Sequence, residues 1–353
     1  MMKKLLLSIS GALSFAVFVI LLATTNHMAQ CQDSQQMAER WSEKKDVAQV
    51  SCFFSANSTI SVEQIEEFEH SLDNSLLEAS ITEESENPGA RLWADAYSAD
   101  GKIVLSSGKT SVETDAIGIG GDFFLFHPLQ LLSGAYFSGN DINKDYCVID
   151  EDAAWQLFGS NDVAGMTVYI GGTPHLVSGV VKRPEGRMEK AAGLDGTLVY
   201  VSYETLTAYG ASNGLNHYEI VMPNPVSNYA ANLVRESMGT DEKEVEVLEN
   251  TSRYSLFNRF KVIAAFGTRS MNGKAIIYPY WENVARGYED LIALCTVFMV
   301  LFLMYPVVLL LVVFVWWWKH KGWTIREVWN LTKDKGERLL EERSKRKEEE
   351  EEL

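Results

Sequence analysis

Histidine and cysteine are the first residues of this chain to consider for chemistry, because they supply common ligands for transition metals. The 353 residues include six histidines and four cysteines. No two histidines have the His-x-x-x-His spacing, and no two cysteines have the Cys-x-x-Cys spacing, that place two ligands side by side on a helix or in a turn. We therefore predict no metal and no cofactor.

Acidic and glycine-rich segments are the next candidates. Asp150, Glu151 and Asp152 suggest an acid–base pair, but they open an expected helix, where the helix dipole favours carboxylates. The glycines at 118–121 and 171–172 are not followed by the Lys-Ser or Lys-Thr of a phosphate-binding loop, and no Gly-x-Ser-x-Gly motif occurs. We expect no catalytic residue, and a binding or mechanical protein rather than an enzyme.

Two apolar stretches are long enough to place the chain in a membrane. Leu5–Thr25 has 21 residues without a charge and Leu291–Trp318 has 28, whereas a helix needs about 20 to cross the hydrocarbon core. A cleaved signal peptide is the alternative for the first stretch, although the usual apolar region of such a peptide is only about 7–15 residues long. We predict transmembrane helices over 1–25 and 291–318.

The charged residues indicate an orientation. Lys3 and Lys4 precede the first span, and six Lys or Arg lie between 319 and 338 after the second. The positive-inside rule then places both termini in the cytoplasm and residues 26–290 outside the cell membrane. The chain carries a formal charge of −17, and the segment 26–290 carries −19, from 19 basic and 38 acidic residues. Such acidity excludes nucleic acid as a partner, because a nucleic-acid binder needs a basic face.

Two cysteines of the expected outer segment leave an alternative open. Cys31 and Cys52 both lie outside the membrane in this topology, where a disulfide can form. Four thiols in a chain of this length do not indicate a disulfide scaffold, so two reduced thiols are an equal possibility.

The first half of the outer segment predicts a stalk followed by a strand–helix–strand unit. Residues 26–46 lack glycine and proline, which favours a helical stalk that continues the first span. Val47–Ser55 is typical of a buried strand. The next helix, capped by Ser61 with Gln64, has one apolar face formed by Ile65, Phe68, Leu72, Leu76 and Ala79. Residues 92–97 and 102–105 then predict a hairpin with its turn at 99–101.

The same order of elements returns near the second span. His217–Met222 and Glu244–Leu248 predict strands, and Pro225–Met238 predicts a helix between them. Two βαβ-type halves thus flank a β-rich insert at about 121–215, an α+β class of fold rather than a doubly wound parallel sheet. We expect this core domain to span 47–270, a returning stalk 271–290, and a charged helical tail 319–353.

A block of about 60 residues, 122–181, carries a more specific signal. It opens with Phe123-Phe124 and passes through Leu131-Leu132-Ser133-Gly134 to Phe137 and Asp141. It continues through a strand at 147–149, then Leu157-Phe158-Gly159, Val163-Ala164-Gly165, and a strand ending Ser178-Gly179-Val180-Val181. This block resembles the periplasmic core domain of the MacB/FtsX/LolC class of ABC-transporter permeases.

The resemblance, taken over roughly residues 1–318, implies a stalked domain that conveys ATP-driven motion within a dimer. It implies no ion path through the bilayer. The family-motif residues are expected to be structural, with glycines at turns and apolar side chains in the core: Phe123, Phe124, Gly134, Phe137, Phe158, Gly159, Gly165, Gly179 and Val180.

The segment after the second span departs from the family pattern. Permeases of this class have four spans, with a cytoplasmic coupling segment of the type Arg-x-x-Glu-Ile-Gly after the second. Here Arg326-Glu327 are present without the Ile-Gly continuation, and we expect the last two spans to be missing. Ile325, Arg326, Val328 and Trp329 are the expected contacts with a cytoplasmic partner.

Two functions are consistent with these features. The favoured one is a permease-like membrane subunit of an ABC transporter complex, which couples a separate ATPase to export, extraction or mechanical transmission at the cell envelope. Its expected partners are that ATPase, a full-length permease or second copy of the chain, and membrane lipid. The alternative is a stand-alone, membrane-anchored binding or scaffold protein. The substrate stays open.

Overall fold

The computed structural model describes residues 2–42, 46–57, 60–82, 90–108, 110–238, 244–269, 276–321, 329 and 332–338. These residues fall into two compact units. One contains residues 1–22 and 298–353, and the other contains residues 23–297. The predicted partner contacts Ile325, Arg326 and Val328 lie outside the described residues, and Trp329 is 70% exposed.

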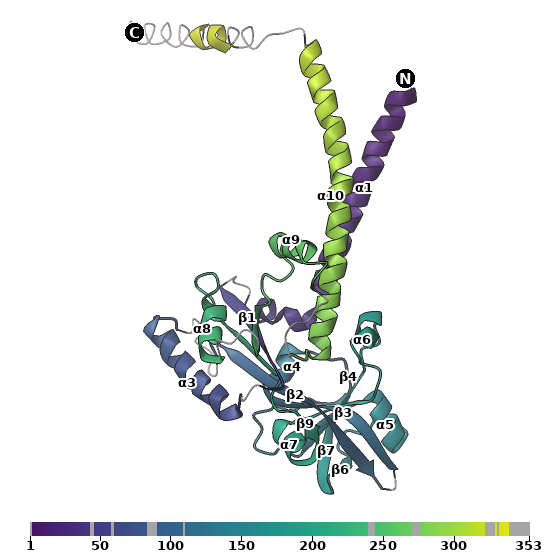
Figure 1. The fold of residues 1–353 in the computed structure, drawn as a ribbon, viewed down its shortest axis with the longest axis vertical. Coiled ribbons are helices and arrows are strands. Elements are labelled where there is room, and N and C mark those ends of the chain that lie inside the picture. The colour runs from purple at the N-terminus through teal and green to yellow at the C-terminus, as the bar shows by residue number, and fades with distance from the viewer. Residues whose placement is uncertain are drawn as a thin grey trace, which may run out of the picture. The chain divides into compact units, whose positions relative to one another are not determined.

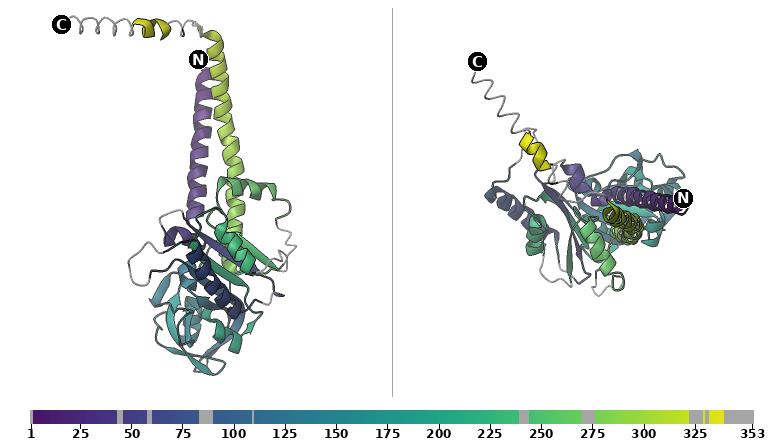
Figure 2. Two further views of the ribbon diagram at one scale, coloured as in Figure 1. Left: turned by 90° about the vertical axis from the view of Figure 1, so that its left-hand side faces the viewer. Right: turned by 90° about the horizontal axis from the view of Figure 1, so that it is seen from above.

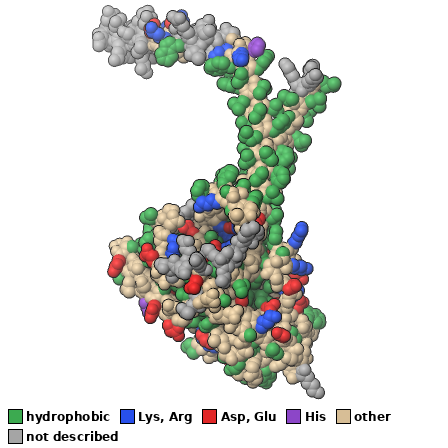
Figure 3. Space-filling model, viewed as in Figure 1, with side chains coloured by type: hydrophobic (Ala, Val, Ile, Leu, Met, Phe, Trp, Pro, Cys, Tyr) green, Lys and Arg blue, Asp and Glu red, His purple; other side chains and the backbone are tan. Residues whose placement is uncertain are grey.

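The first unit is formed by parts of two long helices, α1 (Met2–Gln30) and α10 (Tyr280–His320). Both are long and apolar enough to cross a membrane. Within this unit the Ser10 hydroxyl lies 2.8 Å from the Tyr305 hydroxyl, and Ser14 Oγ donates to the Phe302 carbonyl at 2.8 Å. These hydrogen bonds join two helices that carry many exposed apolar side chains, as Figure 3 shows.

The second unit is built on one mixed sheet (Figure 1). Its described strands follow the order β11-β1-β10-β2-β3-β8-β5-β7-β4, while β6 pairs with β2 and β7, and β9 pairs with β2. The strands are β1 (Val47–Phe54), β2 (Ala94–Ser107), β3 (Thr110–Gly121), β4 (Leu131–Gly134), β5 (Tyr146–Asp150), β6 (Thr167–Ile170), β7 (Thr173–Val181), β8 (Leu198–Ser202), β9 (Ala211–Ser212), β10 (His217–Pro223) and β11 (Val245–Glu249).

The two predicted βαβ-type halves are confirmed, and they interlock. Strand β10 lies between β1 and β2 and is antiparallel to both, so β1–α3–β2 is a split βαβ unit. In the same way β1 separates β10 from β11 in the unit β10–α8–β11. Helices α3 (Val62–Glu78) and α8 (Tyr229–Met238) bury one apolar core against these strands. This arrangement is the α+β class that periodicity predicted.

The N-terminus and apolar face of α3 are close to the prediction. The Gln64 side chain accepts a hydrogen bond from the Ser61 amide at 3.1 Å, as in a capping box. Ile65, Phe68, Leu72 and Leu76 are buried. Ala79 is not, because α3 ends before it and the residue is exposed.

The predicted hairpin turn at 99–101 is wrong. Strand β2 runs unbroken through these residues and pairs with β3 from Ala96–Gly121 to Ser107–Thr110, with Gly108 in the left-handed region after it (φ 59°). Gly101 serves another purpose, because a Cβ at this position would come within 2.6 Å of the Ala211 carbonyl oxygen of β9. The glycine allows two strands to approach closely and does not form a turn.

The predicted helical stalk over 26–46 is interrupted. Helix α1 ends at Gln30, and the short helices η1 (Asp33–Gln35) and α2 (Met37–Trp41) follow. Met37 and Ala38 are buried in the core, which a straight helix would not allow. Gln49 of β1 stabilises the break, since its side chain accepts from the Met37 amide (2.9 Å) and donates to the Ser34 carbonyl (2.7 Å). On the return, α10 begins at Tyr280.

The remaining helices are α4 (Phe123–Phe126), α5 (Glu151–Phe158), α6 (Arg187–Ala191), α7 (Tyr203–Tyr209) and α9 (Leu256–Ala264). The two views of Figure 2 show how they surround the sheet. The capping interpretation of the acidic run is confirmed for Asp150, whose Oδ1 accepts from the Ala153 amide at 2.7 Å. The open question about the cysteines is also answered, because Cys31 and Cys52 are both free.

Candidate functional site: a buried polar network at the base of α10

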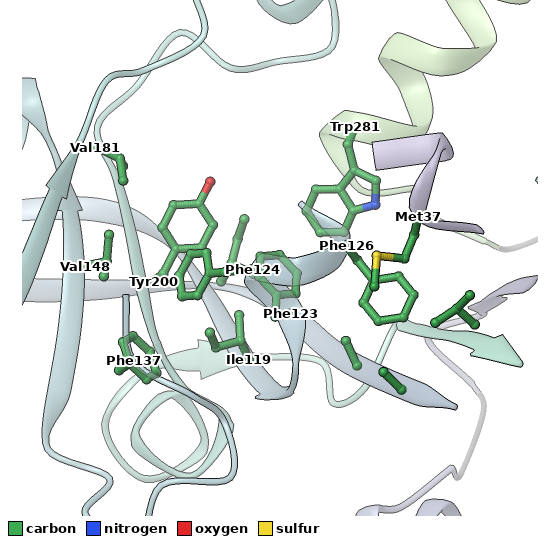
Figure 4. Close-up of a cluster of buried hydrophobic side chains, with 14 of the residues drawn as sticks. Met37, Ile119, Phe123, Phe124, Phe126, Phe137, Val148, Val181, Tyr200 and Trp281 are labelled. Atoms are coloured by element: carbon green, nitrogen blue, oxygen red, sulfur yellow. The ribbon is translucent and has the colours of Figure 1, made fainter. Parts of the chain in front are cut away.

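The family-motif residues lie in two separate apolar clusters rather than in one site. Phe123, Phe124 and Phe137 pack together with Tyr200 and Trp281 (Figure 4). Val180 and the partly buried Phe158 belong to a second cluster beneath α5 and α7.

The motif glycines occupy backbone positions that need glycine. Gly134, Gly159 and Gly165 have φ values of 75°, 72° and 86°. Gly179 of β7 lies opposite Gly134 of β4, and a Cβ on Gly179 would come within 2.7 Å of the Ala135 carbonyl oxygen. These positions are consistent with structural roles for the motif residues, which stay predictions.

The most chemically unusual part of the molecule surrounds Arg253, beside the first turns of α10. Its guanidinium donates to both carboxylate oxygens of Glu282, at 2.7 and 2.8 Å. It also donates to Gln35 Oε1 at 3.0 Å and to Glu289 Oε1 at 2.5 Å. The side chains of Arg253 and Glu282 are 2% and 1% exposed. One cation thus joins α10, the segment after α1, and the loop after β11.

The ionised form of Arg253 is stabilised in place. Burial disfavours the charge, but the Glu282 carboxylate outweighs that effect and raises the pKa of Arg253. A bidentate contact between a planar guanidinium and a carboxylate is strong and directional. The pair therefore fixes the position of the first turn of α10 relative to the sheet.

A chain of hydrogen bonds leads from Arg253 into the sheet. Arg253 donates to Asn250 Oδ1 at 3.3 Å, and Asn250 Nδ2 donates to Ser51 Oγ at 2.7 Å. Ser51 of β1 then donates to Glu219 Oε1 of β10 at 2.6 Å. Glu219 is therefore connected to Glu282 through side chains that are almost completely buried.

Two histidines end this network, which we call the buried polar network: Arg253, Glu282, Asn250, Ser51, Glu219, His127 and His217. His127 follows α4, and its Nε2 lies 3.0 Å from Glu219 Oε2. His217 begins β10, with its Nε2 3.3 Å from Glu219 Oε1 and its Nδ1 3.3 Å from the Ser98 hydroxyl. All three ionisable side chains are 1–2% exposed.

The pKa of Glu219 and the pKa of His127 are both lowered, which favours an ionised carboxylate beside a neutral imidazole. Burial opposes ionisation of Glu219, but His127 and His217 outweigh it and lower its pKa. Burial lowers the pKa of His127, which disfavours the imidazolium that stabilises Glu219. Ionised Glu219 is the form that the geometry supports, because Ser51 donates a short hydrogen bond to it.

His127, His217 and Glu219 are also the residues that could hold a metal, within the part of the chain that the structure describes. Their ligand atoms lie within 4.8 Å of one another, and two imidazoles with a carboxylate are ligands that Zn²⁺ accepts. The distances of 3.0 and 3.3 Å between the imidazole nitrogens and the carboxylate oxygens are equally those of ion pairs. We treat the three side chains as the inner end of the network.

A second group of charged side chains surrounds the base of α10 nearer the surface. Arg286 contacts Glu282 at 2.7 Å and Glu246 at 3.1 Å, and it lies over the Tyr278 ring at 3.8 Å. Arg269 pairs with Glu289 and, at 3.2 Å, with Asp290. These contacts hold the first three turns of α10 to the segments around β11 and α9.

Sequence reasoning did not find this network. Its members come from separate segments, and Ser51 and Asn250 are 199 positions apart. The one local signal was the cluster Glu282, Arg286, Glu289 and Asp290, which stands directly before a long apolar span. Charged residues at helical spacing on such a boundary have to find partners when the helix packs against a domain.

A comparison with known protein families identifies the family of this chain. The family described as "MacB-like periplasmic core domain" matches residues 7–235. The chain belongs to this family. It therefore carries the domain found in MacB-like ABC-transporter permeases, together with two helices suited to a membrane.

One curated protein is similar to part of the chain. The macrolide export ATP-binding/permease protein MacB of Pasteurella multocida (strain Pm70) is 33% identical over 81 residues, which cover 22% of this chain and 12% of that protein. The match thus spans about an eighth of the length of that relative.

Three solved structures are also similar at low identity. The extracellular domain of the noncanonic ABC-type transporter YknZ from Gram-positive bacteria has a TM-score of 0.37 at 18% identity, covering 57% of this chain and 99% of its own. The periplasmic region of MacB from Actinobacillus actinomycetemcomitans has 0.40 at 16%, covering 64% and 94%. A domain of a putative permease protein from Porphyromonas gingivalis has 0.32 at 14%, covering 62% and 96%.

Proposed function

We propose that this chain is a permease-like membrane subunit of an ABC transporter complex. In this complex α10 transmits movement between the membrane and the extracytoplasmic domain. A separate ATPase subunit hydrolyses ATP, and a full-length permease or a second copy of the chain completes the membrane part. Both termini lie in the cytoplasm, and residues 26–290 lie outside.

The observation that carries this proposal is the way α10 is joined to the domain. The helix is continuous from Tyr280 to His320, so its first turn and its apolar part belong to one element. The first turn is held by the bidentate Arg253–Glu282 contact. We expect a tilt or shift of the apolar part of α10 to reach β1 and β10 through Arg253 and Asn250 of the loop after β11, and then through Ser51 and Glu219.

Recovery of partners tests the proposal directly. The full chain, tagged and solubilised in detergent after crosslinking in membranes, is expected to recover an ATPase subunit with Walker motifs. The same chain carrying Arg253→Met is the matched variant, because its cytoplasmic residues are unchanged while its mechanical connection is broken. We expect both proteins to recover the ATPase, and only the parent to support transport by the recovered complex.

Two results would contradict the proposal. Recovery of no ATPase by the parent after crosslinking would favour the stand-alone scaffold instead. Equal transport by the parent and by a folded Arg253→Met variant would show that the connection at α10 does not carry the movement.

A further inference from the structure

Helix α9 presents an apolar face that the domain does not cover. Leu256, Phe257 and Phe260 are 60%, 70% and 52% exposed. Their spacing of one, three and four positions places them on one side of the helix. Lys261 lies beside them, with its ammonium 4.6 Å from the centre of the Phe257 ring. Large exposed aromatic side chains grouped in this way mark an interaction surface.

The charge of this segment is opposite to that of the rest of the domain. Residues 255–269 contain Arg259, Lys261 and Arg269 and no acidic residue, although residues 26–290 together carry −19. Arg259 is used internally, as its Nε donates to the Tyr254 carbonyl at 2.8 Å. Lys261 stays on the exposed surface next to the aromatic rings.

The contacts of α9 place it beside the point where α10 becomes apolar. Arg269, shortly after α9, pairs with Asp290 at 3.2 Å, and Asp290 is the last charged residue before the 28 uncharged residues of α10. Phe266 lines a hollow of about 470 Å³ together with Leu291 and Leu294. Figure 1 and the left view of Figure 2 both show α9 beside α10 at this height.

We propose that α9 binds the surface of the membrane that α10 enters, on the extracytoplasmic side. Phe257 and Phe260 insert at the boundary between headgroups and acyl chains, and Lys261 contacts the phosphates of anionic lipids. A basic amphipathic helix with exposed aromatic residues is the form that lies in this interface. The lipid-facing part of α10 begins beside α9. The bilayer that surrounds this part of α10 therefore also reaches α9. The binding requires α10 to span the membrane but does not require an ATPase.

Depth-dependent quenching in vesicles tests this proposal. The purified full chain receives a single cysteine in place of Phe257, labelled with the environment-sensitive fluorophore NBD. Cys31 and Cys295 are replaced by alanine, whereas Cys52 and Cys147 stay because both are buried and burial raises the pKa of each thiol. The protein is reconstituted in phosphatidylcholine vesicles containing phosphatidylglycerol and a lipid with a shallow nitroxide. Ile142, which is 97% exposed in the insert, is the matched labelling site.

We expect roughly two-fold or greater quenching, with a blue-shifted emission, at position 257 relative to position 142, because an interfacial helix places its apolar face about 5–10 Å into the headgroup region. Lys261→Glu is expected to reduce quenching at 257 in vesicles with phosphatidylglycerol more than in phosphatidylcholine alone. Equal quenching at 257 and 142 would overturn the proposal. So would a label at 257 that is shielded in native membranes but not quenched in vesicles, since a protein partner would then cover α9.

The outcome is independent of the transporter complex. Purified protein contains no ATPase, so a failure to recover partners leaves this measurement unchanged. Leu256, Phe257 and Phe260 are exposed, so we expect the substituted and labelled chains to fold. Size-exclusion chromatography with circular dichroism verifies this.

Discussion

Individual side chains in the buried polar network carry most of the chemistry of this molecule. Arg253 and Glu282 are almost fully buried and contact each other at two points. Removal of one partner leaves the other charge buried with fewer compensating contacts, which is more costly than the loss of an exposed ion pair. The contrast between the two kinds of pair gives a direct test.

Arg253→Met is expected to lower the stability of the domain by up to about 3–5 kcal/mol, because it removes the bidentate partner of the buried Glu282, which keeps only its contact with Arg286. Lys102→Met is the control, since Lys102 and Asp115 form an exposed pair at 3.9 Å and exposed pairs contribute about 0–1 kcal/mol. Thermal unfolding of the full chain in detergent, followed by near-ultraviolet circular dichroism, measures both. Similar unfolding temperatures for the two variants would contradict the role assigned to Arg253.

Asp95 gives a pH-dependent test in another part of the sheet. This side chain is 6% exposed, and burial together with nearby Glu69 raises its pKa well above the usual value, with Asp122 adding to the effect and Tyr218 opposing it. A folded-state pKa above the unfolded value means that the folded chain holds a proton which the unfolded chain has lost. The resulting stabilisation is complete below about pH 3.8 and is lost as the pH rises through the folded-state pKa.

Asp95→Asn cannot ionise, so we expect it to unfold at a higher temperature than the parent at pH 8. We expect the advantage to shrink as the pH falls toward 5. Unfolding temperatures measured at several pH values test this, with the half-exposed Asp115→Asn as the control for a change of side chain alone. Parallel curves for the parent and Asp95→Asn would show that Asp95 is ionised in the folded chain as it is in the unfolded chain, so that its pKa is not raised.

Among the secondary-structure elements, β2 and α1 differ most from their predicted forms. Each difference is explained by a contact. Gly101 leaves room for the Ala211 carbonyl, and the Gln49 side chain forms hydrogen bonds with backbone groups just after the end of α1. Both contacts come from residues distant in the chain. Local pattern is therefore a weaker guide at these two places than in α3, where the apolar face alone selects the helix.

Gly101→Ala tests the unbroken form of β2. The added Cβ would lie 2.6 Å from a backbone oxygen of β9, so we expect a loss of about 1–3 kcal/mol. Gly108→Asn is the control, because a side chain at that position meets no atom within 4 Å and asparagine tolerates its positive φ. Urea unfolding of the two full-length variants distinguishes the cases. A tolerated Gly101→Ala with a damaging Gly108→Asn would place the turn at 99–101 after all.

For the protein overall, the family relationship and the two apolar helices define a membrane-anchored, MacB-like component of the ABC-transporter permease type. Partners and direction of insertion belong to the proposal. In the proposal, the segment after α10 is cytoplasmic and contacts the ATPase subunit. Trp329 is 70% exposed and therefore available for contact.

Deletion of residues 323–353 is expected to abolish recovery of the ATPase subunit while the domain keeps its unfolding temperature, because the described residues of this segment, 329 and 332–338, include none that is buried. Co-purification and thermal unfolding of the same preparation measure the two effects. Replacement of the predicted contact Trp329 by alanine is the milder variant. Undiminished recovery after the deletion would place the contact elsewhere.

Local patterns in the amino-acid sequence were sufficient for the two long apolar helices, the two βαβ-type halves, the capping of α5 by Asp150 and the family resemblance. Each of these depends on neighbours within a few positions or on the length of an apolar run, so its cause is present in the sequence itself. The break after α1, the continuous β2 and the buried polar network were decided by tertiary structure. Glu219, His127 and Arg253 belong to one network only because β1 pairs with β10 and α10 returns beside them. These polar residues form a connected network because they are buried together, and not because of their spacing in the sequence. Their burial depends on how the whole chain packs.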